Sequence, residues 1–171
     1  MRDIQTCFKT CVLNLKSIDI PIAKRVRVKV NTRARSRWGQ AQKQEDGSFI
    51  IEISNLLLDE RCPEESLLST IYHELIHTCE DCFNHGVKWN TYVAKASKAL
   101  HVDITYGATA QEKLKNPQLV AEVINDYIRK RKTYVVECSV CHVKSIYHKK
   151  VNVSNYCCGK CKSSALIIYQ I

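Results

Sequence analysis

Apolar positions recur with helical spacing in four stretches of the chain. Residues 2–18 place their apolar side chains on one side of a predicted helix. A second helix is predicted after Pro63, a residue suited to a first helical position, and two glutamates follow in its first turn, where the helix dipole favours acidic groups. A third helix is expected beyond Asn84, a candidate N-cap, and a fourth at about 117–129.

A different periodicity, apolar and polar residues in strict alternation, marks the segment Arg25–Val30. Its valines point one way and its basic side chains the other, which is typical of a half-buried strand. Asp46-Gly47 is a turn signal between a second strand and a third, Phe49–Ile53. These strands predict a small antiparallel sheet packed on the helices, in an α+β domain.

The second predicted helix contains an HExxH motif, His73-Glu74-Leu75-Ile76-His77. Two histidines four residues apart lie on one face of a helix, so both imidazoles can reach one metal ion. Zn²⁺ accepts imidazole nitrogen, and Glu74 is placed to take a proton from a water held by the ion. We therefore predict that His73 and His77 bind a catalytic zinc and that Glu74 is the catalytic base.

A catalytic zinc needs a third protein ligand. His85 is the best candidate, because the predicted helix is interrupted near Asn84 and the chain can turn back there toward the motif. Asp81 lies too far along one straight helix, while Glu112 and Glu122 remain distant alternatives. The nearby Cys79-x-x-Cys82 and the lone His101 beyond the third helix also invite a functional reading. We interpret both as structural, the cysteines as small half-buried side chains and His101 as an end-of-helix residue.

The C-terminal segment contains a second candidate metal site, made of two C-x-x-C pairs separated by sixteen residues. This spacing is typical of a four-cysteine structural zinc site on a small ribbon that has too few residues for a core of its own. Cys157 is adjacent to one pair and is an alternative to Cys158. The predicted ligands of this structural zinc are Cys138, Cys141, Cys158 and Cys161.

Composition limits the function classes. The 171 residues, of which 45% are hydrophobic, suit one domain with a small appendage. No apolar run is long enough to span a membrane and the N-terminus does not resemble a signal peptide, so we expect a cytoplasmic protein whose ten cysteines are ligands or free thiols.

The net charge of +9 is segregated along the chain. Residues 24–37 carry +7 and residues 129–171 carry +8, whereas residues 38–128 carry −7. Two basic blocks flanking an acidic segment suggest a polyanion partner, most commonly nucleic acid, although basic residues also serve as plain solvated surface. The candidate nucleic-acid contacts are Arg33, Arg35, Arg37, Arg129, Lys130, Arg131, Lys132, Lys149 and Lys150. Tyrosines interleaved with lysines in the ribbon suit a single strand, with rings under bases.

At these motifs the sequence resembles the SprT-like metalloproteases, the group that includes Spartan. The resemblance rests on HELIH, on the continuation His85-Gly86-x-x-Trp89, on the segment 31–39 and on the terminal cysteines, and it covers roughly residues 4–171. It implies a zincin-like fold and activity on proteins bound or crosslinked to DNA, with DNA helping to switch on cleavage.

Our reading is therefore a SprT-like catalytic domain over residues 1–131, followed by a zinc ribbon over 132–171. The predicted function is a zinc-dependent endopeptidase activity that is associated with DNA. If the protein binds DNA, we expect it to be located at the nucleoid or chromatin. We expect one edge of the sheet to hold the substrate as an added strand, with Arg33–Gln40 near the cleft. Two alternatives stay open: a non-catalytic nucleic-acid-binding or regulatory protein on a zincin scaffold, and a peptidase with no DNA role.

Overall fold

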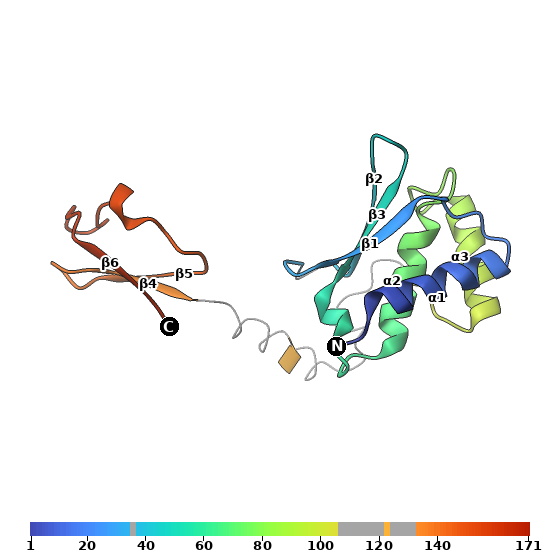
Figure 1. Cartoon of the computed structure of the whole chain (residues 1–171), viewed down its shortest axis with the longest axis horizontal. Helices are drawn as coiled ribbons and strands as arrows, with labels where there is room; N and C mark the ends of the chain where they lie inside the picture. The colour runs from blue at the N-terminus through green and yellow to red at the C-terminus, as the bar shows by residue number, and fades with distance from the viewer. Residues whose placement is uncertain (35–36, 106–121, 124–132) are drawn as a thin grey trace. The chain divides into compact units, whose positions relative to one another are not determined.

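The computed structural model describes residues 1–34, 37–105, 122–123 and 133–171. The chain divides into two compact units, Met1–Val123 and Ile124–Ile171, shown in Figure 1. The domain boundary predicted at 131/132 and the helix predicted at 117–129 fall largely outside the described residues. No helix in the described ranges has the length and apolar character needed to cross a membrane.

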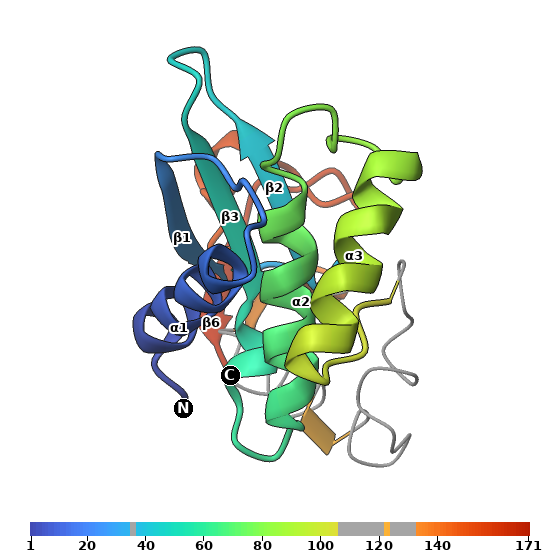
Figure 2. The same cartoon turned by 90° about the vertical axis from the view of Figure 1, so that its right-hand side faces the viewer.

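Three α-helices form one layer of the N-terminal unit: α1 (Ile4–Ser17), α2 (Glu64–Ile76) and α3 (Val87–Leu100). The side chain of Asp3 accepts hydrogen bonds from the backbone N–H groups at the start of α1, which fixes where that helix begins. Helix α2 lies between α1 and α3 and packs on the sheet (Figure 2). This central position explains why nine of its thirteen residues are buried, including Leu67, Ile71 and Leu75.

The sheet of this unit contains β1 (Val26–Asn31), β2 (Gly39–Lys43) and β3 (Phe49–Ser54), in the order β1-β3-β2. A 3₁₀ turn, η1 (Asn55–Leu58), connects β3 toward α2. Strands β2 and β3 form the antiparallel hairpin expected around Asp46-Gly47.

The prediction of a wholly antiparallel sheet is wrong for the other strand pair. Strand β1 runs parallel to β3, with Val28 opposite Ile51. Strand β2 lies on the far side of β3 from β1, so β3 rather than β2 is the neighbour of β1. The chain reverses direction twice between β1 and β3, once before β2 and once in the hairpin, so β1 and β3 run in the same direction.

The C-terminal unit is a three-stranded antiparallel sheet in the order β5-β4-β6, formed by β4 (Tyr134–Cys138), β5 (Lys144–Tyr147) and β6 (Leu166–Gln170). A short 3₁₀ turn, η2 (Val153–Asn155), lies in the long connection between β5 and β6. Few of the described side chains of this unit are buried, and the exceptions include Val135 and Val136 of the central strand. A core this small needs further stabilisation, as bound metal supplies in small domains.

Candidate metal centres

Three histidines converge in the N-terminal unit, His73 and His77 from α2 and His85 from the loop before α3. Their Nε2 atoms lie 3.1 Å from one another in all three pairs. This is the trio predicted from the sequence.

Backbone carbonyls orient two of the three rings. Nδ1 of His73 lies 3.0 Å from the carbonyl oxygen of Thr105, and Nδ1 of His77 lies 2.7 Å from that of Cys82. A carbonyl oxygen can only accept, so each Nδ1 carries the proton and each Nε2 presents a lone pair toward the other rings. Such outer contacts are how proteins fix the tautomer of a histidine that binds metal.

The trio fits a zinc ion. Nitrogens 3.1 Å apart, each about 2.0–2.1 Å from a shared ion, would subtend roughly 100° there, near the tetrahedral angle. Lone pairs aimed at one point repel each other unless a cation lies between them. The donor set and spacing are thus those of a three-histidine site that keeps a fourth position for water or substrate.

Burial tunes the chemistry of His77, whose side chain is only 8% exposed. Desolvation lowers the pKa of His77, the nearby His85 lowers it further, and the hydrogen bond to the Cys82 carbonyl opposes both effects. The net result favours the neutral imidazole, which is the form that binds a metal.

Trp89 supports the trio from α3 and was not assigned this role from the sequence. It is fully buried, and its ring centroid lies 4.9, 5.4 and 4.5 Å from those of His73, His77 and His85, respectively. The ring stacks on His77 at an interplanar angle of 25° and meets the other two edge to face. The spacing His85-Gly86-x-x-Trp89 was the available signal, because it puts the indole in the first turn of α3.

Glu74 points into a confined space between α2 and β2. Its side chain is 7% exposed, and its Oε1 atom is 2.7 Å from where a Cβ atom of Gly39 would be. The two residues approach because α2, which carries Glu74, packs against β2, which begins at Gly39.

The alternative ligands considered from the sequence do not join the trio. Asp81 is exposed, has a left-handed backbone (φ 59°) and pairs with Lys88 at 3.3 Å. Glu122 is exposed and outside the histidine group, and Glu112 lies outside the described residues. Asn84 does not cap α3 through its side chain, because Gly86 occupies the N-cap position.

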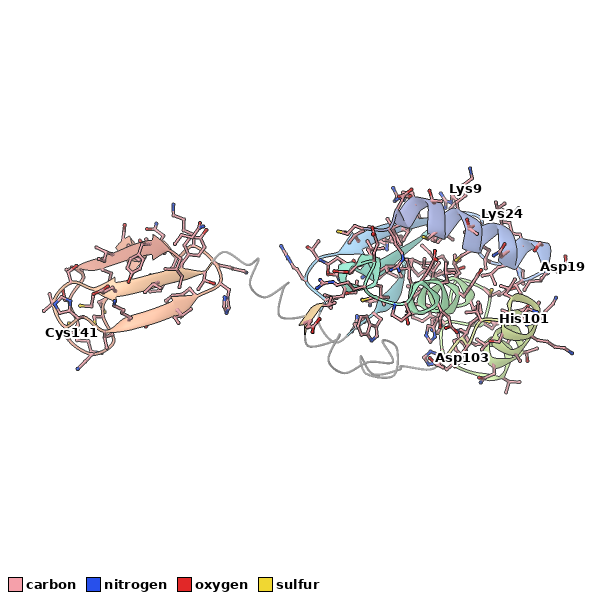
Figure 3. All side chains as sticks on the ribbon, turned by 90° about the horizontal axis from the view of Figure 1, so that it is seen from below. Lys9, Asp19, Lys24, His101, Asp103 and Cys141 are labelled. Carbon is pink, nitrogen blue, oxygen red and sulfur yellow. The ribbon has the colours of Figure 1, made fainter. Side chains whose placement is uncertain are left out.

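The remaining residues near the motif have structural environments. Cys79 and Cys82 are buried, more completely than the half-buried state predicted, and burial raises the pKa of both thiols. His101 is exposed at the C-cap of α3 in a left-handed conformation, as an end-of-helix residue (Figure 3). Neither the two thiols nor His101 belongs to the three-histidine group.

A second group, of four cysteines, lies in the C-terminal unit. The Sγ atoms of Cys138 and Cys161 are 3.5 Å apart, as are those of Cys141 and Cys158, and all four lie within 4.8 Å of one another. Thiolates at about 2.3 Å from one tetrahedral zinc ion are separated by roughly 3.8 Å, so the group fits such an ion. Cys141 lies in the loop at one end of this sheet (Figure 3).

The two C-x-x-C turns have the same local geometry. Backbone N–H groups of Cys141 and Val140 bond to the sulfur of Cys138 and lower its pKa. Those of Cys161 and Lys160 lower the pKa of Cys158 to about 6 in the same way. These bonds stabilise thiolate, the form that binds metal. Cys157 is exposed and outside the group, so the structure favours Cys158 between the two.

The predicted nucleic-acid contacts are only partly described. Arg33, Arg37, Lys149 and Lys150 are exposed, and Arg37 donates a hydrogen bond to Gln40. Arg35 and the run Arg129, Lys130, Arg131, Lys132 lie outside the described residues. The C-terminal unit also has a cavity of about 220 Å³, whose lining includes Tyr147 and Tyr156.

Comparison with known proteins gives one consistent result. The model of the SprT-like family matches residues 5–113, which is more than half of the chain. A protein named "Protein SprT-like" from Bacillus cereus is 27% identical over 120 residues, covering 68% of this chain and 70% of the relative. Another B. cereus protein of that name is 26% identical over 140 residues, covering 80% and 78%. A third, from Bacillus thuringiensis subsp. konkukian, is 26% identical over 129 residues, covering 71% and 74%.

Proposed function

Because the chain belongs to the SprT-like family, we propose that it is a zinc-dependent endopeptidase with a zincin-like catalytic domain. The observation that carries this proposal is the convergence of three Nε2 atoms at 3.1 Å, with two of the rings fixed by backbone carbonyls. His73, His77 and His85 would hold the catalytic ion, and the four cysteines would hold a structural one.

When bound, zinc would lower the pKa of a water molecule and polarise the substrate carbonyl. Glu74 accepts the proton of the attacking water and passes it to the leaving amine. Its buried position between α2 and β2 limits the orientations of its carboxylate. Trp89 and the two backbone carbonyls keep the imidazole rings in place during this proton transfer.

The substrate would lie along β2, which begins at Gly39 and is one of the two edge strands of the sheet. An extended peptide can add to such an edge through main-chain hydrogen bonds, which suits cleavage of proteins of varied sequence. The exposed Arg37, two residues before this strand begins, lies in the segment that we predict to be near the cleft.

We further propose that the substrates are proteins bound or crosslinked to DNA. Two features support a nucleic-acid partner: the exposed Lys149 and Lys150, and the cavity lined by Tyr147 and Tyr156 in the same unit. Exposed cations can bind phosphates, while the two tyrosines within a mostly apolar lining offer rings on which a base of a single strand can stack. Four thiolates around one zinc carry two net negative charges, which partly offsets these lysines.

A degradation assay with and without single-stranded DNA tests the proposal and separates its rivals. The zinc-loaded protein should cleave a DNA-bound protein substrate, and faster when the strand is present. A peptidase with no DNA role would cleave equally in both conditions. A non-catalytic nucleic-acid-binding protein would bind the strand and cleave nothing in either condition, which would contradict the proposed function.

A further inference from the structure

Gly39 and Glu74 occupy space that only one side chain can fill. A Cβ atom on residue 39 would lie 2.7 Å from both Cγ and Oε1 of Glu74, and 2.8 Å from Cγ2 of Thr70. Ordinary carbon–carbon contacts are about 3.5–4.0 Å. The backbone of Gly39 does not have the positive φ that would itself require glycine. The requirement at this position is therefore space beside the Glu74 carboxylate, not backbone freedom.

Strand β2 cannot move away to make room. Gly39 pairs with Ile53, which is fully buried in the central strand β3. The carbonyl oxygen of the preceding residue, Trp38, accepts a hydrogen bond of 2.8 Å from the backbone N–H of Ser54, and the Trp38 side chain is buried. Moving residue 39 outward would break this ladder and expose the indole.

Helix α2 is equally constrained on its side of the contact. Thr70 is buried, and its Oγ1 donates a hydrogen bond of 2.8 Å to the carbonyl oxygen of Ser66, which fixes the direction of its methyl group. Thr70 and Glu74 are four residues apart, so both project from the same face of the helix toward β2. Of the three groups in contact, only the Glu74 side chain has several rotatable bonds with which to yield.

We infer that Gly39 is a positioning residue for Glu74: the bare backbone at the start of β2 forms the wall against which the catalytic carboxylate is held. The inference rests on the proposed role of Glu74 for its catalytic consequence, and on the contact geometry alone for its effect on packing. A methyl group at residue 39 pushes the carboxylate out of line with the three-histidine site. Displacements of about 1 Å at a catalytic group can cost about a hundredfold in rate.

The activity test compares Gly39→Ala with the wild-type protein under zinc-loaded conditions. We expect kcat to fall by about tenfold to a hundredfold, with KM and the number of bound zinc ions almost unchanged, because the histidines are not displaced. Adding Thr70→Ser relieves only the methyl contact at 2.8 Å, so it should not restore kcat. Wild-type kcat in Gly39→Ala, or full recovery with Thr70→Ser, would overturn the inference.

A thermal unfolding cycle tests the contact without reference to catalysis. Gly39→Ala should lower the midpoint in the wild-type background and lower it less in the Glu74→Ala background, where the Cγ and Oε1 atoms are gone and only the contact with the Thr70 methyl group remains. Equal shifts in the two backgrounds would show that the residues are not coupled and would overturn the inference. If Glu74→Ala itself keeps full proteolysis, the proposed function fails, while the unfolding cycle still reports on the contact.

Discussion

Nδ1 of His77 lies 2.7 Å from the backbone carbonyl oxygen of Cys82, so the Cys79-x-x-Cys82 segment orients a member of the three-histidine group through its backbone. The two thiols are buried, outside the histidine group, and have raised pKa values. A thiolate ligand or a reactive pair would be expected to have lowered ones. The sequence favoured a packing role for these cysteines, and their burial and raised pKa values agree with that role.

Removal of one histidine should empty one site and leave the other intact. The native protein is expected to bind two zinc ions per chain and His77→Ala only one, because two imidazoles are insufficient for a stable site. Elemental analysis after dialysis measures both values. Cys82→Ala is the matched control and should keep two ions, since it retains the carbonyl that orients His77. Loss of an ion from Cys82→Ala would indicate that the Cys82 thiolate is itself a metal ligand.

Adjacent cysteines in the C-terminal unit should behave differently. Cys158→Ala is expected to lose the structural ion because the Sγ of Cys158 faces the other three thiols. Cys157→Ala should retain it, because Cys157 is exposed and lies outside the group. Zinc content and thermal unfolding of the pair measure the difference. Equal losses of zinc in the two variants would contradict the assignment of Cys158, rather than Cys157, as the ligand.

Stability should decline in alkali. Burial raises the pKa of Cys11 from 9.0 to about 12 and that of Tyr72 from 10.0 to about 12. Raised values mean that folding favours the protonated forms, so the contribution of Cys11 is complete below about pH 9 and is lost as the pH rises toward 12. Urea midpoints should therefore fall between about pH 8 and about pH 10.5, and less steeply in Cys11→Ala. Parallel slopes in the two proteins would contradict this assignment.

Binding of single-stranded DNA should weaken steeply with salt through counterion release. The double variant Lys149→Gln/Lys150→Gln should lower the slope of log affinity against log salt by about 1.4, at roughly 0.7 per phosphate contact. Lys9→Gln/Lys16→Gln, on the exposed side of α1, is the control of equal charge and should keep the native slope. Fluorescence anisotropy with a labelled oligonucleotide measures both. Binding that ignores salt, or equal slopes in both variants, would argue against these contacts.

Sequence patterns predicted the parts of the molecule that depend on local periodicity. The helix expected over 2–18 is observed as Ile4–Ser17, and the strands expected at 25–30 and 49–53 are Val26–Asn31 and Phe49–Ser54. Both groups of candidate metal ligands are observed together in the structure. HExxH and C-x-x-C encode ligand spacing within a single turn or loop, whereas His85 joins its group from a separate loop.

Features that depend on distant segments were not predictable in this way. The parallel pairing of β1 with β3 requires a knowledge of strand order, which no local pattern contains. The Thr105 carbonyl that orients His73 lies 32 residues away, and backbone carbonyls have no sequence signature. Gly39 lies 35 residues before Glu74, and its importance follows only from the approach of β2 to α2. The N-cap of α3 is Gly86 rather than the predicted Asn84, so the helix begins at Val87.

The central claim is that Glu74 supplies the proton transfer for a zinc-dependent cleavage. The most direct measurement is the rate at which zinc-loaded Glu74→Gln degrades a DNA-bound protein, with zinc content measured on the same sample and with Glu64→Gln, an exposed glutamate of the same helix, as control. We expect loss of cleavage in Glu74→Gln with two zinc ions retained, and native cleavage in Glu64→Gln. Native cleavage by Glu74→Gln would rule out this role for Glu74.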